Sequence, residues 1–320
     1  MLANRNTMGN TPGSRQRGVT LIELMVALLI GSILLIGAIS VFSDSRRMFR
    51  TSEIIARLQE NARFALDTIE PDIRAAAYWG LANGYTLIEG TATAADAVPA
   101  GMDVTGDCEP NFSLDLNAAV NGGNDAFPYP DCAVYGNGTV ANTDVLVVRH
   151  AGRNVAPLTA GRLQIQSDRE KIRVLVDGVL PAGFELASSE TRNLTVNTYY
   201  LSQDSVLGVG VPSLRRKGLG AGPALVDDEI IPHVQNFQVQ LGADTTGDGA
   251  ANMYVNPGNE PAGAVIVAVR VWLLFQADDI DSSYVDSRAY NFAGQALGPF
   301  NDNRHRLLVS KTIQLRNTRF

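Results

Sequence analysis

Residues 17–25 read Arg-Gly-Val-Thr-Leu-Ile-Glu-Leu-Met, and this stretch decides the fold because it sets one carboxylate just inside a long apolar run. From Val19 to Phe42 the chain has 24 residues whose only charged side chain is Glu23. As a helix, this run is about 36 Å long, which is enough to span a bilayer. A carboxylate is costly in such a place, so Glu23 indicates a role with a partner that neutralises it.

The leader before this run is basic and has no acidic residue; its charged residues are Arg5, Arg15 and Arg17. The positive-inside rule therefore predicts a cytoplasmic leader, with everything after Phe42 on the other side of the membrane. An ordinary secretory signal has a shorter apolar region and a small-residue cleavage site, for which residues 38–40 are a poor match. An ordinary signal anchor explains the length of the run, but it does not explain the spacing of Gly18 and Glu23.

Gly18, followed by an apolar segment with Glu23 at the fifth position after it, resembles the prepilin signature of type IV pilins and type II secretion pseudopilins. This resemblance implies cleavage between Gly18 and Val19 by a membrane aspartyl prepilin peptidase, and N-methylation of Val19. It also implies that Glu23 meets the N-terminal amine of a neighbouring subunit, in a dry interior where a charge-assisted contact is strong. Val19 stands where Phe is commonest in major pilins, which favours a minor subunit. The leader has 18 residues from Met1, or 11 if the chain starts at Met8.

The composition, with 45% hydrophobic and 18% charged residues, is that of a globular protein. After Phe42 there remain 278 residues, enough for one large head or two small lobes. Without the leader the chain has 23 basic and 33 acidic residues, a formal net charge of −10, so nucleic acid is not an expected partner. The one dense basic cluster, Leu214–Lys217, has no interleaved aromatic residues, and we interpret it as a solvated loop.

A second apolar pattern follows a polar exit from the membrane at residues 43–45. Its spacings of three and four predict one stripe of an amphipathic helix, made of Ile55, Leu58, Ala62, Ala65, Ile69, Ile73 and Ala76. Pro71 lacks an amide hydrogen and is expected to kink or reset this helix. Another turn or two over Asp72–Tyr78 is then expected before Gly80 stops the helix. The apolar stripe is predicted to pack on the head.

Several segments resemble the PilW family of type IV pilus minor pilins. In the helix these are Leu58–Asp67, Asp72–Ala76 and Tyr78–Gly80, and further along they are Thr143–Arg149, Val234–Val239, Ala268–Val271 and Leu315–Asn317. In that family a Cys often follows the last Gly; Leu81 stands here, so a disulfide built from that Cys is not expected. The resemblance implies a minor pilin that helps initiate pilus assembly, at the filament tip with other minor pilins. The partners it implies are those minor pilins, the major pilin, the prepilin peptidase and the inner membrane, with the head in the periplasm and later on the cell surface.

Four parts are thus predicted: a leader (1–18), a transmembrane part of a stem helix (19–42), its periplasmic part (43–80) and a β-rich head (81–320). Residues 81–142 read as a loop-rich region. It contains Cys108 and Cys132, and an extracytoplasmic chain is expected to pair them, removing about 3 to 4 kcal/mol of unfolded-state loop entropy.

Strand-like runs follow at Asp144–His150, Leu163–Gln166, Ile172–Val176, Val196–Leu201, Phe237–Leu241, Ala264–Gln276 and Leu307–Leu315. The run Phe237–Leu241 alternates apolar and polar residues, as in a half-buried antiparallel strand. The run Ala264–Gln276 is nearly continuous and apolar, so it is expected to be the central strand. One long helix followed by strands predicts an α+β fold with an antiparallel sheet laid against the stem.

One further segment resembles the start of a metal-binding loop. Oxygen-bearing residues there have the spacing of the start of a calcium loop: Asp244, Thr246, Asp248 and Asn252. Val255 stands where an EF-hand needs a bidentate Glu. A polar hairpin with its tight turn at Gly247–Gly249 is therefore the favoured interpretation, with calcium as the alternative.

Catalytic motifs are weak. The three histidines, His150, His233 and His305, show no metal-ligand spacing. The glycine-rich run Lys217–Gly222 lacks the strand and helix of a phosphate-binding loop and reads as a flexible loop. We therefore expect no enzyme and no cofactor other than the calcium alternative. Two other functions stay open, a minor pseudopilin of a type II secretion system and a pilus-tip adhesin; a head of more than 200 residues favours the PilW interpretation over a pseudopilin.

Overall fold

The computed structural model describes residues 18–82 and 88–318, and the chain divides into two units between Glu53 and Ile54. Helix α1 (Leu21–Ala75) runs across this division. In the first unit every residue from Gly18 to Arg50 is exposed. An 18-residue window of α1 has a mean hydropathy of 2.7 and none of it is buried, so this helix is long and apolar enough to cross a membrane.

In the second unit, α1 buries one apolar stripe, made of Ile54, Leu58, Ala62, Ala65, Ile69 and Ile73. The predicted start of this stripe was wrong, because Ile55 is 41% exposed whereas Ile54 is 4% exposed. At this end the guanidinium of Arg57 lies 3.4 Å from the carboxylate of Asp279, so the head lies on the Arg57 side of the helix. Ile54 is three residues before Arg57 and shares that side, which explains why it is covered instead of Ile55.

The end of α1 also differs from the prediction. The helix continues through Pro71, which costs one hydrogen bond, and ends at Ala75. Ala77, and not Gly80, is the first residue after the helix with a left-handed backbone, at φ 61°. The reason is that strand β3 (Val145–Val155) binds the next backbone groups: the amide of Ala77 donates to the carbonyl of Arg149, and the carbonyl of Tyr78 accepts from the amide of Ala151.

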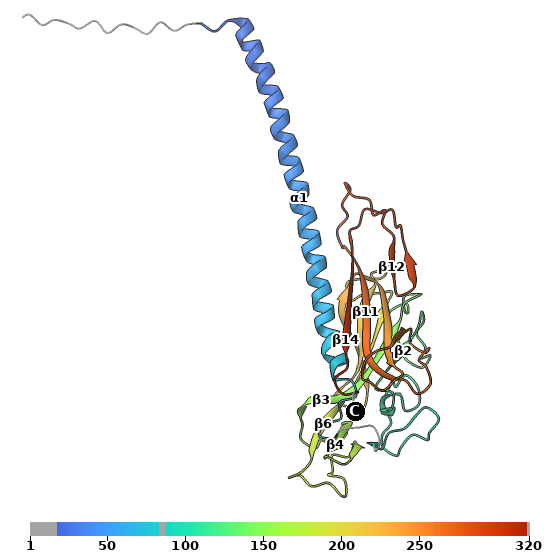
Figure 1. Ribbon diagram of the computed structural model, residues 1–320. Coiled ribbons are helices and arrows are strands. Elements are labelled where there is room, and N and C mark those ends of the chain that lie inside the picture. Colours follow the sequence, from blue (N-terminus) through green and yellow to red (C-terminus); the bar gives the residue numbers. More distant parts are fainter. Residues whose placement is uncertain (1–17, 83–87, 319–320) are drawn as a thin grey trace, which may run out of the picture. The chain divides into compact units, whose positions relative to one another are not determined.

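The head of the second unit has two large sheets (Figure 1). The first has the order β1-β5-β4-β6-β3-β2, with β7 added on β6 and β8 on β7. Its strands are β1 (Ile88–Glu89), β2 (Val120–Gly123), β3 (Val145–Val155), β4 (Gln164–Ser167), β5 (Ile172–Leu175), β6 (Glu190–Ser202), β7 (Ser213–Leu219) and β8 (Leu225–Pro232). All of its pairs are antiparallel except β1 with β5.

The second sheet is antiparallel, in the order β10-β9-β11-β14, and a separate hairpin pairs β12 with β13. Its strands are β9 (Val234–Asp244), β10 (Met253–Val255), β11 (Val265–Gln276) and β14 (Arg306–Gln314); the hairpin is β12 (Tyr290–Phe292) and β13 (Gln295–Leu297). All seven predicted strands are present. The predicted central strand is confirmed, since β11 lies between β9 and β14.

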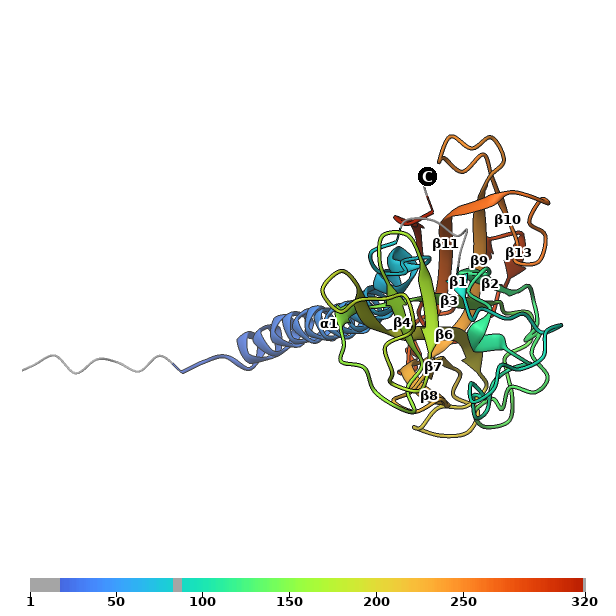
Figure 2. The ribbon, with the colours of Figure 1, turned by 90° about the horizontal axis from the view of Figure 1, so that it is seen from below.

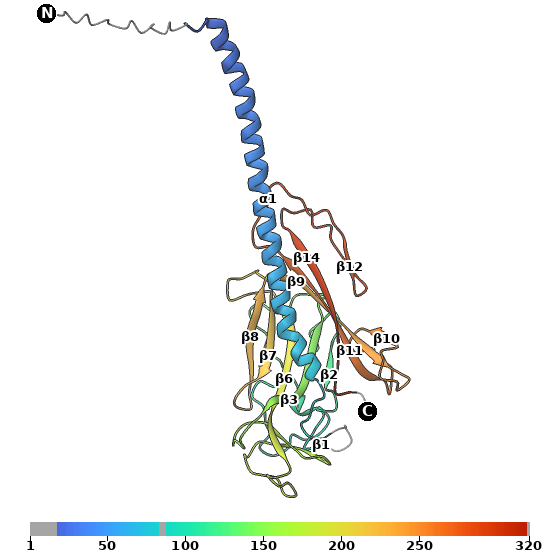
Figure 3. The ribbon, with the colours of Figure 1, turned by 60° about the vertical axis from the view of Figure 1, so that its left-hand side comes forward.

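The main core lies between the buried stripe of α1 and one face of each sheet. Figure 3 shows the last turns of α1 lying over β3, β6 and β9. Strand β3 serves two cores: Leu146 and Val148 face α1, while Val145 and Val147 face a second core. Because both faces of this strand are covered at its start, its first four residues, Val145–Val148, are all apolar. The predicted α+β class is confirmed.

The second core is closed by the loop-rich segment, residues 88–142, which gathers on one side of the head (Figure 2). Only short elements occur there, namely β1, a 3₁₀ turn at Phe112–Leu114, and β2. The side chains of Phe112, Leu114 and Leu116 are nevertheless fully buried. This segment therefore forms the second wall of a core rather than a loose insertion.

Candidate functional site

The residues predicted to be cut, methylated and paired lie at the start of α1. Gly18, Val19 and Thr20 precede the helix and are exposed. Thr20 caps the helix: its Oγ1 accepts from the amide of Glu23 at 3.3 Å, and its carbonyl accepts from the amide of Leu24 at 3.2 Å. Residues 1–17, which include the predicted leader charges and Met8, lie outside the described residues.

Glu23 occupies the first turn of α1, three residues after its cap. Thr20 and Glu23 thus stand in the spacing of a capping box, a signal that the sequence carries and that the reasoning from membrane chemistry overlooked. A carboxylate in the first turn is favoured by the helix dipole. The geometry also keeps the Gly18–Val19 bond outside the helix, with Glu23 one turn away from the amine that cleavage would free.

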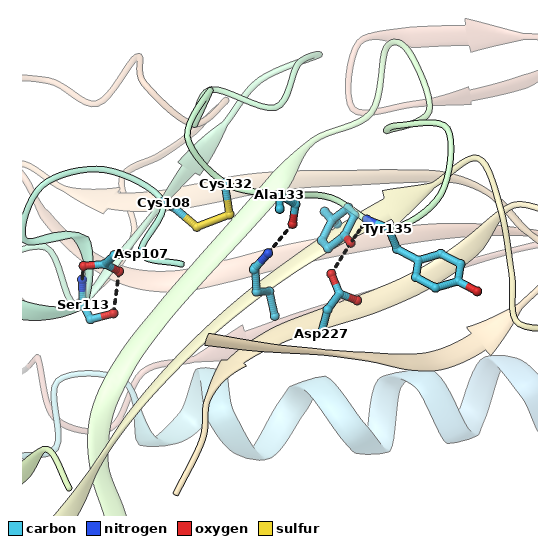
Figure 4. Close-up of a disulfide and its surroundings, with 9 residues drawn as sticks. Asp107, Cys108, Ser113, Cys132, Ala133, Tyr135 and Asp227 are labelled. Carbon is cyan, nitrogen blue, oxygen red and sulfur yellow. Dashed lines mark hydrogen bonds between the residues drawn. A yellow bond between two sulfur atoms is a disulfide. The ribbon is translucent and has the colours of Figure 1, made fainter. Parts of the chain in front are cut away.

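The two cysteines are joined in a disulfide, as predicted (Figure 4). Cys108 is fully buried in the second core. Next to it, the carboxylate of Asp107 accepts from the hydroxyl of Ser113 at 2.8 Å and from its amide at 3.3 Å. Burial raises the pKa of Asp107 against these bonds. The disulfide therefore fastens the loop-rich segment inside its own core.

Arg149 of β3 holds the same segment from the sheet side and was not foreseen. Its guanidinium is fully buried and lies 4.7 Å from the centre of the Phe112 ring. It donates to the carbonyl of Phe112 at 3.0 Å, to the carbonyl of Ala118 at 2.6 Å and to the side chain of Asn121 at 3.0 Å. Burial lowers the pKa of Arg149.

The interpretation of Leu214–Lys217 as a solvated loop was wrong. This cluster forms most of β7, and Arg215 is only 2% exposed. Its guanidinium contacts the carboxylates of Asp227 at 2.6 Å and Glu229 at 3.0 Å, and lies 3.7 Å from the ring centre of Tyr135. The ammonium of Lys217 donates to the carbonyl of Ala133. These cations are used inside the head, so they form no surface for nucleic acid.

The glycine-rich run after Lys217 was likewise misread as a flexible loop, because it turns a hairpin. The amide of Gly220 donates to the carbonyl of Ala224 at 2.9 Å, and β7 pairs with β8. The register sets Arg215, Arg216 and Lys217 opposite Glu229, Asp228 and Asp227. A basic run, a glycine-rich turn and an acidic run form a signal for a charge-matched hairpin.

The four candidate calcium residues run from Asp244, the last residue of β9, through the turn that follows it. The Asp244 carboxylate accepts from the amides of Thr246, Gly247 and Gly249 at 2.9, 2.7 and 2.6 Å. Burial opposes its ionisation, but these amides lower the pKa of Asp244. Asn252 accepts from the amide of Thr245 at 2.7 Å, and Asp248 from the amide of Ala250 at 2.9 Å. The loop satisfies its own backbone, which supports the polar hairpin.

Among residues 18–82 and 88–318, no group of three or more His, Cys, Asp or Glu side chains could hold a metal ion. Calcium thus stays a prediction that titration of the protein would test. The histidines are not gathered into one site either: His150 faces Asp72, His233 faces Asp278, and His305 lies 3.0 Å from Asp281.

A polar cluster locks the end of α1 to the first sheet. The carboxylate of Asp72 accepts from Tyr199 and from Asn197, both at 2.5 Å, and lies 3.6 Å from Nε2 of His150. Nδ1 of His150 lies 2.8 Å from the carbonyl of Ala151 and therefore donates to it. Burial opposes ionisation of Asp72, but His150, Tyr199 and Asn197 together lower its pKa.

Two family models match the chain. The model described as Type IV Pilus-assembly protein W matches residues 198–317, and the prokaryotic N-terminal methylation motif matches residues 13–39. These matches confirm the resemblance at the prepilin signature and at three of the quoted segments, Val234–Val239, Ala268–Val271 and Leu315–Asn317. The quoted segments before residue 198 lie outside both models.

Among solved structures, the chain is similar to a type IV-like pilin from Thermus thermophilus. The identity is 12% and the TM-score 0.38, over 82% of this chain and 98% of that one. No curated protein matches the chain in sequence.

Proposed function

Since the chain is a type IV pilin-like protein with a PilW-family segment and a prepilin methylation motif, we propose that it is a minor pilin that helps to initiate type IV pilus assembly. The observation that carries the proposal is the start of α1, residues 21–42: an exposed apolar helix with one carboxylate, Glu23, in its first turn. Exposing such an apolar surface to water is unfavourable. The surface needs a bilayer before assembly and other apolar stems afterwards.

In this proposal the protein is made as an inner-membrane precursor with its head in the periplasm. A prepilin peptidase cuts after Gly18, and Val19 becomes the methylated N-terminus. The partners are other minor pilins, with which it occupies the filament tip, and the major pilin that follows them. The role is structural, and the described residues carry no arrangement that we interpret as catalytic.

The physical reason for an initiating subunit lies in the cost of the first contacts. A filament that starts from membrane-dissolved monomers lacks the neighbours whose amines neutralise each buried Glu. A preassembled set of minor pilins supplies those neighbours, so the first major pilin adds to an existing template. A carboxylate paired with an amine in a dry interior gains much more than the same pair in water.

The first experiment is to identify the N-terminal residue of the protein from native membranes by mass spectrometry, with and without the prepilin peptidase. We expect methylated Val19 only when the peptidase is present. An intact leader, or cleavage near Ser40, would overturn the assignment to pilins. Loss of surface pili on deletion would then separate pilus initiation from a secretion pseudopilin, whose loss would stop protein export instead.

A second experiment separates the two roles of Glu23. Glu23→Gln removes the charge, while Thr20→Ala removes the helix cap and keeps the charge. We expect Glu23→Gln and Glu23→Ala to lose co-purification with partner pilins while membrane insertion is unchanged, and Thr20→Ala to retain both. Unchanged co-purification of Glu23→Gln would show that the charge is not what joins the stems.

A further inference from the structure

Two hollows adjoin each other at the end of α1 in the head. One, of about 500 Å³, is lined by Glu70, Pro71, Arg74, Ala75, Arg153 and Arg316. The other, of about 430 Å³, is lined by Arg74, Thr312, Ile313, Gln314, Leu315 and Arg316. They share Arg74 and Arg316, so they form one surface, which we call the arginine hollow.

Three different elements bring their cations to this surface: Arg74 from α1, Arg153 from β3, and Arg316 from the segment after β14. Among the described residues that line it, Glu70 is the only acidic one. It is already neutralised by the ammonium of Lys311 and by Arg74, and the hydrogen bond from Lys311 lowers the pKa of Glu70. Within residues 18–82 and 88–318, no carboxylate pairs with Arg153 or Arg316.

The end of a helix attracts cations, but this does not account for three of them. The negative end of a helix dipole is equivalent to about half an elementary charge. The side-chain amide of Asn317 already donates to the carbonyls of Arg74 and Ala76, at 3.4 and 3.2 Å. The arginine hollow therefore keeps a surplus of positive charge, on a mature chain whose formal net charge is −10.

Three buried arginines of the head differ from Arg153 and Arg316, because they are paired with carboxylates. Arg215 forms ion pairs with Asp227 and Glu229, Arg306 with Asp286 and Asp302, and Arg192 with Glu190. Against this background, open guanidiniums in a concave surface indicate an anionic ligand that arrives from outside. Guanidinium forks suit carboxylates, which they can bind through two parallel hydrogen bonds.

We propose that the arginine hollow binds an acidic turn on the head of a neighbouring pilin subunit. The proposal deepens the proposed function, since it names the chemistry of one partner contact. Among the described residues of the lining there is no aromatic side chain on which bases could stack, and the rest of the head is acidic, which disfavours nucleic acid. A short peptide with adjacent carboxylates fits two adjoining hollows.

This chain shows what such a turn looks like at the other end of its own head. The side chains of Asp278 and Asp279 are 77% and 55% exposed, and Asp279 pairs with Arg57. Arg57 and Arg74 are 17 residues apart on α1, about 26 Å along the helix. A head with carboxylates at one end and a basic hollow at the other suits a head-to-tail contact, the kind that builds helical filaments.

The test uses the full-length protein in detergent and a fluorescent hexaglutamate peptide as the probe, with binding followed by anisotropy. We expect saturable binding that weakens with salt and that falls at least about tenfold in the double variant Arg153→Gln/Arg316→Gln. The matched control, Arg63→Gln/Arg173→Gln, removes two exposed arginines elsewhere and should bind as the unaltered protein does. Thermal unfolding of both variants should be unchanged, because all four side chains are exposed.

Two results would overturn the proposal: equal weakening by the control variant, or displacement of the peptide by inorganic phosphate at the peptide's own concentration, which would indicate a site for a free oxyanion. Peptide binding needs neither cleavage nor a filament. If the peptide does not bind, the assignment of Val19 as the methylated N-terminus is unaffected. If Val19 is not the N-terminus, the peptide experiment still decides whether the arginine hollow binds carboxylates.

Discussion

The two parts of α1 form one continuous helix, but they differ in whether their apolar side chains are exposed or buried. From Leu21 to Arg50 its apolar side chains are all exposed, whereas from Ile54 to Ala75 one stripe is buried by the head. The apolar stripe of the later part is covered by the head of the same chain. The apolar side chains of the earlier part can be covered only by a bilayer or by other stems. The same helix is therefore part of the folded core in one half and an interaction surface in the other.

The largest expected effect comes from making the same substitution in both parts. Ile69 is fully buried and Ile36 is 68% exposed. Ile69→Ala should lower the free energy of unfolding of the head by about 4 kcal/mol, because it leaves a cavity against both sheets. Ile36→Ala should leave it unchanged. Denaturant unfolding in detergent, followed by tryptophan fluorescence, measures both; equal effects would abolish the distinction between the two parts.

The disulfide tests whether the head supports its own loop-rich wall. Cys108→Ser/Cys132→Ser opens a loop with a sequence separation of 24 residues and should lower the free energy of unfolding of the head by about 3 kcal/mol. Reduction of the unaltered protein should have the same effect. Helix content measured by circular dichroism should persist in both cases, and its loss would show that α1 depends on this wall.

The polar cluster around Asp72 holds the far end of α1 to the first sheet, and the stability that it contributes depends on pH. The pKa of Asp72 is below its ordinary value of 3.8, so the folded state favours the carboxylate. Its stabilisation is present above pH 4 and is lost as the pH falls through the lowered pKa. Asp72→Asn should cost about 2 kcal/mol at pH 7. The difference from the unaltered protein should shrink in unfolding curves below pH 4, and a difference that grows there would contradict this assignment.

The smallest expected effect lies where the two parts of the helix meet. Ile54→Val should lower the free energy of unfolding by about 1 kcal/mol, since it deletes a buried methylene. Ile55→Val should change it by less than about 0.5 kcal/mol, because that side chain is partly exposed. If the two variants had equal midpoints in denaturant titrations, Ile55 would belong to the buried stripe as periodicity alone predicts.

Much of the fold could be predicted because local pattern and tertiary burial agree. The apolar run with Glu23, most of the stripe of α1, the centre of each long strand and the disulfide partners all carry their signal within a few residues. Helical periodicity alone could not separate Ile54 from Ile55, because the choice depends on which flank the head covers, and residues far along the chain, such as Asp279, lie on that flank.

The hairpin of β7 and β8 was missed for a related reason. Charged residues read as solvated, and only the pairing of Arg215 with Asp227 and Glu229 makes their burial favourable. The acidic partners follow the basic run by about ten residues, so a search for opposite charges across a glycine-rich turn would have found them. Arg149 had no such signal, because most of its partners are backbone carbonyls.

That choice of partners by Arg149 has a consequence for how the head can vary. A carbonyl is present whatever side chain its residue carries, so the hydrogen bonds to residues 112 and 118 do not depend on the identity of those residues. The loop-rich wall is held by its buried apolar side chains, by hydrogen bonds to its main chain and by one disulfide. Its outward side chains can therefore be exchanged without loosening the wall, so the protein can change the surface it shows to its surroundings while keeping one frame.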